Sequence, residues 1–182
     1  VEEAQFIAKK AKIKNKEKYL KKNFITIDPD DAKDLDDAIF VEEDKNVTNR
    51  DGFILYIAIA DVSYFVRLGS AIDLEAKKRG NSTYFPDKVI PMLPEVISNE
   101  TCSLKAGLFK RCIIAKITVD KDGKKLSHSF QRSLIKIANN FSYGQFNQFL
   151  EKSSSGSNKY AIYRKVYKVL KQSNLLNSRL LL

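Results

Sequence analysis

Apolar runs separated by turn signals predict a protein built largely on β-strands. Two short apolar runs, Phe24–Ile27 and Ala38–Val41, flank a polar loop near the N-terminus. After Asp51-Gly52, a dipeptide typical of a tight turn, the chain returns through Phe53–Val62 and completes a hairpin. Because this returning run is apolar on both faces, we expect it in the middle of a sheet.

Helices are predicted between and after the strands. Ser70, with Asp73 three residues later, is a variant of the capping box, and Gly80 is a suitable stop. These signals predict a helix over residues 70–79, and Ser142–Leu150 has the character of a second, short helix. Three prolines that follow the first helix should break regular structure across a long loop: Pro86, Pro91 and Pro94.

A second hairpin completes the predicted architecture. Arg111–Val119 and Leu126–Leu134 are strand-like runs on either side of the turn dipeptide Asp122-Gly123. We therefore expect an α+β fold, with a mixed, mainly antiparallel sheet, helices packed on it and the polar loop at the edge of the sheet.

The two ends of the chain differ in composition from its middle. Eight lysines lie between Lys9 and Lys22, so residues 1–22 are predicted to be a basic lead-in helix or linker. Residues 153–158 are rich in serine and predict a flexible stretch. Beyond them, apolar residues at helical spacing should face a core, although we expect the partner that covers them to be missing from this chain: Tyr160, Tyr163, Val166, Tyr167 and Leu170.

The chain is basic overall, except in the polar loop between the first two apolar runs. The 182 residues carry a formal net charge of +10 and have 43% hydrophobic content, which is enough to bury a sizeable core. This excess of Lys and Arg favours a polyanionic partner, with nucleic acid ahead of a membrane surface. The polar loop is an exception to the basic composition, because it holds six aspartates between Asp28 and Asp37.

Crowded carboxylates repel one another unless a multivalent cation lies between them. Asp28 ends one predicted strand and Asp37 begins the next, so both can face one point, while Asp34 and Asp36 share a face in extended backbone. Oxygen ligands without His or Cys suit a hard ion, and we expect Mg²⁺ or Mn²⁺.

Alternative roles for the aspartates fit less well. A solvated acidic loop is the common case, but here apolar strands hold both ends of the loop. An EF-hand loop beginning at Asp28 would place Lys33 where glycine is required. A phosphatase with an aspartate nucleophile fits Asp28-Pro29-Asp30 and stays a less favoured alternative, because it gives Asp34, Asp36 and Asp37 no role.

Four segments in order resemble the ribonuclease II and ribonuclease R family, and details of the third favour the ribonuclease R branch. The first is Thr-Ile-Asp-x5-Asp-x-Asp-Asp-Ala, ending at Ala38. The second is Ile57-Ala58-Ile59-Ala60-Asp61-Val62-Ser63, and the third is Arg79-Gly80-Asn81-Ser82-Thr83-Tyr84-Phe85-Pro86-Asp87-Lys88-Val89-Ile90-Pro91-Met92-Leu93-Pro94-Glu95. The fourth comprises Ser98-Asn99 and Leu104, with Cys102-Ser103 between them.

The resemblance implies a processive 3′-to-5′ exoribonuclease that hydrolyses single-stranded RNA to 5′-mononucleotides. By position in the motif, Asp28, Asp37 and Asp34 would bind metal. Asp36 would place a second metal or the attacking water, and matches the aspartate whose loss stops cleavage while RNA still binds. The catalytic pair would be Asp34 and Asp36, and the four metal-site residues Asp28, Asp34, Asp36 and Asp37. The resemblance also assigns RNA binding to three residues of the third segment: Tyr84 by stacking, with Arg79 and Lys88.

The resemblance covers about residues 24–150, the first part of the family's catalytic domain. We therefore expect residues 23–182 to be the N-terminal part of an incomplete RNB-type domain, a fragment that begins at Val1 and ends at Leu182. The alternative is an RNA-binding remnant that cannot turn over substrate. We expect a cytoplasmic protein, with neither a membrane anchor nor an obligate protein partner evident.

The two cysteines and the single histidine are not predicted to have a catalytic or metal-binding role. Cys102 and Cys112 are separated by nine residues, which indicates neither a zinc site nor a disulfide framework, and Cys102 is predicted to be a buried structural thiol. The single His128 lies on a predicted strand between two serines and should be a surface residue.

Overall fold

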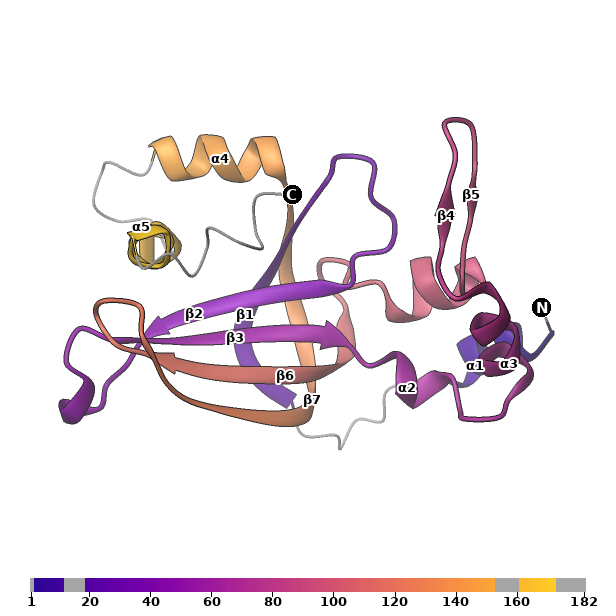
Figure 1. Cartoon of the computed structure of the whole chain (residues 1–182), viewed down its shortest axis with the longest axis horizontal. Helices are drawn as coiled ribbons and strands as arrows, with labels where there is room; N and C mark the ends of the chain where they lie inside the picture. Colours follow the sequence, from indigo (N-terminus) through magenta and orange to yellow (C-terminus); the bar gives the residue numbers. More distant parts are fainter. Residues whose placement is uncertain (1, 12–18, 153–160, 173–182) are drawn as a thin grey trace.

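The computed structural model describes residues 2–11, 19–152 and 161–172. Its centre is a closed barrel in the strand order β1-β2-β3-β6-β7 (Figure 1). The strands span Tyr19–Asp28 (β1), Asp37–Glu43 (β2), Phe53–Ala60 (β3), Phe109–Val119 (β6) and Lys125–Ser142 (β7). Both predicted hairpins are confirmed, as β2–β3 and β6–β7, and the expectation of an α+β fold with a mainly antiparallel sheet is correct.

A parallel pair of strands closes the barrel. All other neighbours are antiparallel, but β1 runs parallel to β7, with Tyr19 opposite Leu134 and Asp28 opposite Ser142. A closed barrel has no edge, so the aspartate loop lies at one end of the barrel and the predicted edge position was wrong. Sequence alone missed this because β7 continues well past Leu134, where the predicted strand ended.

The barrel interior and one of its outer faces form two apolar clusters. The interior is filled by side chains with no exposed surface, among them Phe24, Ala58, Ile114, Ile135 and Ile137. The outer cluster joins barrel strands to a C-terminal helix and comprises Ile25, Val41, Phe53, Val119, Tyr163 and Val166.

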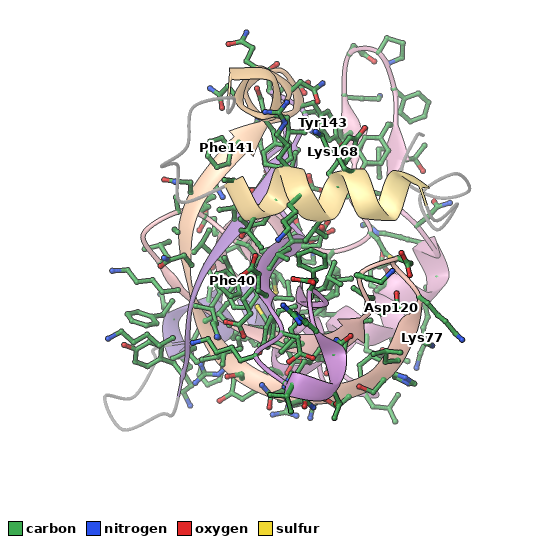
Figure 2. All side chains as sticks on the ribbon, turned by 90° about the vertical axis from the view of Figure 1, so that its left-hand side faces the viewer. Phe40, Lys77, Asp120, Phe141, Tyr143 and Lys168 are labelled. Carbon is green, nitrogen blue, oxygen red and sulfur yellow. The ribbon has the colours of Figure 1, made fainter. Side chains whose placement is uncertain are left out.

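Two C-terminal helices cover this outer cluster. Helix α4 (Tyr143–Lys152) begins with a capping box, because the Ser142 Oγ accepts from the Gln145 N–H at 3.2 Å and Gln145 accepts from the Ser142 N–H at 3.0 Å. Helix α5 (Ala161–Gln172) lies across this side of the barrel beside α4 (Figure 2). Its Tyr163 and Val166 are buried against this chain's own barrel, so for these two residues the expectation of a missing partner was wrong, whereas Tyr167 is 42% exposed. Tyr160 and the 153–158 stretch lie outside the described residues, as does the side chain of Leu170.

Several short elements lie at the end of the barrel opposite the β2–β3 and β6–β7 turns (Figure 1). They are α1 (Glu2–Lys10), α2 (Val62–Phe65), α3 (Ala71–Arg79), the small hairpin β4–β5 (Thr83–Tyr84 and Val89–Ile90) and the π-helical turn η2 (Val96–Cys102). The predicted helix over 70–79 is confirmed, with Ser70 capping the Asp73 N–H at 3.2 Å and Gly80 ending it at a φ of 75°.

Three boundaries differ from those predicted. Strand β1 already begins at Tyr19, inside the expected lead-in segment, while most of that segment between α1 and β1 lies outside the described residues. Strand β3 ends at Ala60 because the short helix α2 follows it. The long proline loop contains the hairpin β4–β5, whose Phe85 N–H donates to the Lys88 carbonyl at 2.8 Å. No helix in the described parts is long and apolar enough to cross a membrane.

Candidate nuclease site

The aspartate loop connects β1 to β2 where the sequence placed it. Asp28 is the last residue of β1 and Asp37 the first residue of β2, as predicted. Asp28 and Asp34 are half-buried, whereas Asp36 and Asp37 are exposed. Figure 1 shows the loop rising from the same side of the barrel as the hairpin β4–β5.

The backbone of the loop is tied down by the segment that follows η2. Leu35 points into the interior, and its N–H donates to the Ser103 Oγ at 3.1 Å. The same hydroxyl donates to the Lys33 carbonyl at 2.8 Å, and the Leu104 N–H donates to the Leu35 carbonyl at 2.8 Å. These bonds restrict the loop at Lys33 and Leu35, on either side of Asp34, since three hydrogen bonds and the buried Leu35 side chain hold the backbone there.

A further bond fixes the end of the loop. The Ala60 N–H, at the end of β3, donates to the Asp36 carbonyl at 2.9 Å. Asp36 and Asp37 are therefore held against the neighbouring strand even though their side chains are exposed.

Burial and mutual repulsion oppose ionisation of these aspartates. The surrounding protein displaces part of the water around these carboxylates, and this desolvation is the main cause that raises the pKa of Asp28, Asp36 and Asp37 above the usual value, although Asp36 and Asp37 keep exposed surface. Neighbouring charge adds to it, because Asp37 and Asp34 raise the pKa of Asp28, and Asp34, Asp37 and Asp28 raise that of Asp36. The four carboxylates predicted to act together thus lie near enough to repel one another.

The donor chemistry of the loop fits a hard cation, but the side chains are not arranged as a finished metal cage. Asp28 Oδ2 is buried without a hydrogen-bond partner, which is the condition that a cation would relieve. In the described parts of the chain, however, no three His, Cys, Asp or Glu side chains are grouped closely enough to hold a metal ion as they stand. Binding a cation would therefore draw these carboxylates closer together.

The three residues predicted to bind RNA lie on or beside the hairpin β4–β5. Tyr84 is 68% exposed and its neighbour Phe85 is 46% exposed. Lys88 lies over the Phe85 ring, with its Nζ 5.7 Å from the ring centroid. Arg79 ends α3 and donates to the Pro91 carbonyl at 2.8 Å, so it supports the base of the hairpin.

Sequence reasoning missed two residues that shape the site. Ser103 lay inside the fourth family-like segment, and its burial between apolar neighbours was the available signal. Asn140 gave no signal, because its hydrogen bonds to Thr26, Leu104 and Ala106 depend on the parallel pairing of β1 with β7.

The second family-like segment and the cysteines have structural roles. Asp61 is buried and pairs with Arg132, whose Nε lies 3.1 Å from Asp61 Oδ2, while the Ser63 hydroxyl donates to Asp61 Oδ1 at 2.7 Å. Cys102 and Cys112 are buried free thiols, and burial raises their pKa to about 11 and about 12. The burial predicted for Cys102 and the surface position predicted for His128 are confirmed.

The closed barrel and its anchored, aspartate-rich loop can be compared with known protein families. Residues 16–180 match the RNB domain, and the chain is a member of the RNB family. Within that family it is similar to ribonuclease R. It is 39% identical over 156 residues to ribonuclease R of Vibrio parahaemolyticus, an alignment that covers 82% of this chain and 18% of the relative.

Solved structures agree with this relationship. Ribonuclease R of Mycoplasma genitalium in complex with double-stranded RNA superposes with a TM-score of 0.78 and 31% identity, over 98% of this chain and 32% of that one. The same enzyme in complex with ribose-methylated single-stranded RNA gives a TM-score of 0.74 and 32% identity, over 94% of this chain and 27% of that one. The present chain therefore spans about a fifth to a third of the length of these relatives.

The fold is also found in a protein described as a pseudonuclease. Yeast Ssd1, described as a pseudonuclease, superposes with a TM-score of 0.68 at 21% identity, covering 82% of this chain and 18% of that one. At that identity the likeness shows the fold alone, so activity has to be inferred from the aspartate loop.

Proposed function

We propose that this chain supplies the aspartate loop of a metal-dependent, processive 3′-to-5′ exoribonuclease that hydrolyses single-stranded RNA to 5′-mononucleotides. The observation that carries the proposal is the loop itself. In a chain of net charge +10, partly buried aspartates repel one another on a backbone fixed by Ser103 and Leu104. Such an arrangement is unfavourable in isolation and becomes favourable when a divalent cation binds.

Each carboxylate has a separate task in this proposal. Asp28, Asp34 and Asp37 bind Mg²⁺ or Mn²⁺, and Asp28 offers its buried, unpartnered Oδ2. Asp36 is exposed next to them and orients the attacking water or a second ion. The chemistry supplied by the bound ion is neutralisation of the negative charge that develops on the phosphate and activation of water as a nucleophile.

RNA binding combines stacking with phosphate contacts. Tyr84 presents an exposed ring on which any base can stack, and Arg79 and Lys88 supply positive charge near the same hairpin. The excess of lysine and arginine over the whole chain favours a polyanion without selecting a sequence.

A second candidate is a non-catalytic RNA-binding member of the family. It is favoured by the spacing of the carboxylates, since no described group of three stands ready to hold an ion. The phosphatase alternative is less favoured, because Asp34, Asp36 and Asp37 belong to the same electrostatic cluster as Asp28 and would have no role in it.

Asp36→Asn separates chemistry from binding. The substitution removes one charge and almost no volume, so in the protein that carries this chain the release of mononucleotides from the 3′ end should fall by orders of magnitude, while single-stranded RNA binds at least as tightly. Asp31→Asn, an exposed change in the same loop, is the control and should cleave normally. If RNA binding is lost together with cleavage, Asp36 is structural, and an inactive parent protein that still binds RNA would establish the second candidate.

A further inference from the structure

One row of residues crosses the outer face of the barrel from the aspartate loop to the last strand. In the register of the sheet, Asp37 lies opposite Ile59, Ile59 opposite Ile113, and Ile113 opposite Arg132. Residues opposite one another point to the same side of a sheet, and their neighbours along each strand point to the other side. Those neighbours on β2, β3 and β6 fill the interior: Ala38, Ala58, Ala60, Cys112 and Ile114. The row therefore faces outward, on the side where Figure 1 shows β2, β3 and β6 next to one another.

This row is open to solvent between the two charged residues at its ends. Ile59 and Ile113 are exposed although they are apolar, and the Arg132 side chain is 67% exposed. Neighbouring strands lie about 4.8 Å apart, so three steps across the sheet place Arg132 about 14 Å from Asp37. That distance is within the span of the several nucleotides that a groove for single-stranded nucleic acid holds.

Arg132 is held in a fixed orientation from one side. Its Nε lies 3.1 Å from Oδ2 of the buried Asp61, and its Nη2 donates to the Ser63 Oγ at 2.8 Å. The Ser63 hydroxyl donates in turn to Asp61 Oδ1 at 2.7 Å. A guanidinium group has five N–H donors in a planar fork, so an arginine fixed through two of them can still present others to a phosphate. Because its side chain is already ordered, Arg132 loses little conformational entropy on binding.

Two more arginines lie beside this ion pair, around the helix α2. The exposed Tyr64 ring of α2 has the guanidinium carbon of Arg111 4.3 Å from its centroid and that of Arg67 5.5 Å from it. The Asp61 N–H donates to the Arg111 carbonyl at 2.9 Å and thereby ties the start of α2 to β6. Tyr64, Arg67, Arg111 and Arg132 are called the arginine cluster below. Asp61 carries a single negative charge and cannot by itself neutralise three arginines.

We propose that the arginine cluster is a second RNA-binding surface, which contacts the phosphates of a strand whose cleaved end lies at the aspartate loop. This role rests on the proposed exoribonuclease function and adds a site separate from the hairpin β4–β5. Arginine suits the phosphates of RNA because its parallel N–H donors match their oxygens. The exposed row leads from the cluster across β6 and β3 to Asp37, and the two residues between its ends are isoleucines, which do not repel a polyanion.

Binding of a labelled oligouridine to the protein that carries this chain, measured in a chelator at several salt concentrations, tests this surface without cleavage. Arg67→Gln removes an exposed charge, and Asp61→Asn combined with Arg132→Gln removes an ion pair without changing the net charge. Each variant should reduce the slope of log affinity against log salt by about 0.7, the value for one phosphate contact to a single strand. The dissociation constant should rise about 5-fold at about 0.1 M salt. Arg50→Gln, an exposed change between β2 and β3, is the control and should leave both values unchanged.

Two results would overturn the second RNA-binding surface. Unchanged salt slopes in both variants would show that neither Arg67 nor Arg132 contacts phosphate. An equal loss of affinity in Arg50→Gln would show that the overall charge of the protein, rather than the arginine cluster, attracts RNA. If the variant without the ion pair melts below the assay temperature, Arg67→Gln decides the question, because it leaves the pair of Asp61 with Arg132 intact.

RNA cleavage by the same proteins separates failure of this surface from failure of the proposed function. If the wild-type protein binds RNA through the arginine cluster but releases no mononucleotides in Mn²⁺, the cluster is supported and the nuclease function fails. If it cleaves RNA while both variants bind RNA as the wild type does, the nuclease function is supported and the cluster is wrong. Weaker binding of polyglutamate by those variants would then assign the cluster to an acidic protein partner instead.

Discussion

The carboxylates of the aspartate loop make this part of the protein sensitive to pH. Burial raises the pKa of Asp28, Asp36 and Asp37 above 3.8 in the folded protein, and neighbouring charges add to the effect at Asp28 and Asp36. Between that value and the raised one, the folded state binds more protons than the unfolded state, so stability falls as pH rises through this window. The loss is complete once the three groups have ionised in the fold.

Asparagine at these three positions should remove this pH-dependent loss. We expect the triple variant Asp28→Asn, Asp36→Asn and Asp37→Asn to become more stable than the wild type as pH rises above about 4, the ordinary range of an aspartate. Melting curves in the presence of a chelator measure the difference.

Asp44 provides a control residue whose effect on stability changes with pH in the opposite direction. Hydrogen bonds from Asn49 and from the Asn46 backbone lower the pKa of Asp44, so its contribution to stability is present above the usual pKa and is lost as pH falls through the lowered one. Asp44→Asn should therefore lower stability at neutral pH. If the difference in stability between the triple variant and the wild type stays constant with pH, the expected repulsion between the loop carboxylates is contradicted.

Gly52 leaves no space for a larger side chain, because the Asn49 side chain lies against it. A Cβ at Gly52 would lie 2.3 Å from the Asn49 side chain, which donates to Asp44 Oδ2 at 2.9 Å and to the Val119 carbonyl at 3.0 Å. Asn49 cannot move away without breaking the bonds that hold this turn to β6.

Gly52→Ala should therefore lower the free energy of unfolding by about 1–3 kcal/mol, the usual range for overpacking. Gly144→Ala is the matched control, because its Cβ would meet only the Ser142 Oγ at 3.9 Å inside α4. That change should stabilise the protein by up to about 1 kcal/mol. Denaturant unfolding of both variants decides between these outcomes, and equal effects would exclude Asn49 as the cause.

Among the elements, the connection from η2 to β6 has the largest influence on the site. Its Ser103 and Leu104 hold the loop at Leu35, and its Ala106 fixes Asn140. The acidic loop therefore depends on a segment that contributes no acidic residue to it.

Ser103→Ala should release the loop without unfolding the barrel. Removing this buried hydroxyl leaves the Leu35 N–H and the Lys33 carbonyl without their partner, which should lower stability by about 1–3 kcal/mol. Hydrogen exchange at the Leu35 amide should accelerate more than exchange in β3. Ser98→Ala, whose hydroxyl donates to the neighbouring Asn99 side chain, should leave exchange at Leu35 unchanged. Unaltered protection in Ser103→Ala would show that Leu104 alone holds the loop.

Local signals predicted the elements well and their distant partners poorly. The dipeptides Asp51-Gly52 and Asp122-Gly123 predicted the two hairpins, and Ser70 and Gly80 predicted the ends of α3. These predictions succeeded because turns and helix caps depend on residues that are adjacent in the sequence. The positions of Asp28 and Asp37 at strand ends followed from their apolar flanks. The anchoring by Ser103 and Asn140 was not predictable in this way, since their partners lie 68 and 114 residues away.

At the scale of the whole molecule, stability rests on barrel closure. Ile135 and Ile137 of β7 and Phe24 of β1 are fully buried in the interior, so the parallel pair supplies apolar surface as well as hydrogen bonds. The closing pair cannot be weakened locally without opening the core to water.

Ile137→Ala should lower the free energy of unfolding by about 2–5 kcal/mol, as expected for a large-to-small change in a packed interior. Leu126→Ala, on the same strand but half exposed, should change it by no more than about 0.5 kcal/mol. Chemical denaturation monitored by tyrosine fluorescence measures both values. Similar small effects would mean that closure contributes little to the stability of the barrel.

Closure of the barrel also imposes an order on biosynthesis. The ribosome makes β1 and its aspartates early, but β1 pairs with β2 through a short register and gains its longer partner only when β7 is complete, 114 residues after Thr26 at the position of Asn140. Until then, the nascent chain carries a cluster of carboxylates at the end of a strand that lacks its longer partner. A protein translated only as far as β6 would display the acidic motif without the β1–β7 pairing that ends at Asp28, so this site matures late although its most recognisable residues are synthesised first.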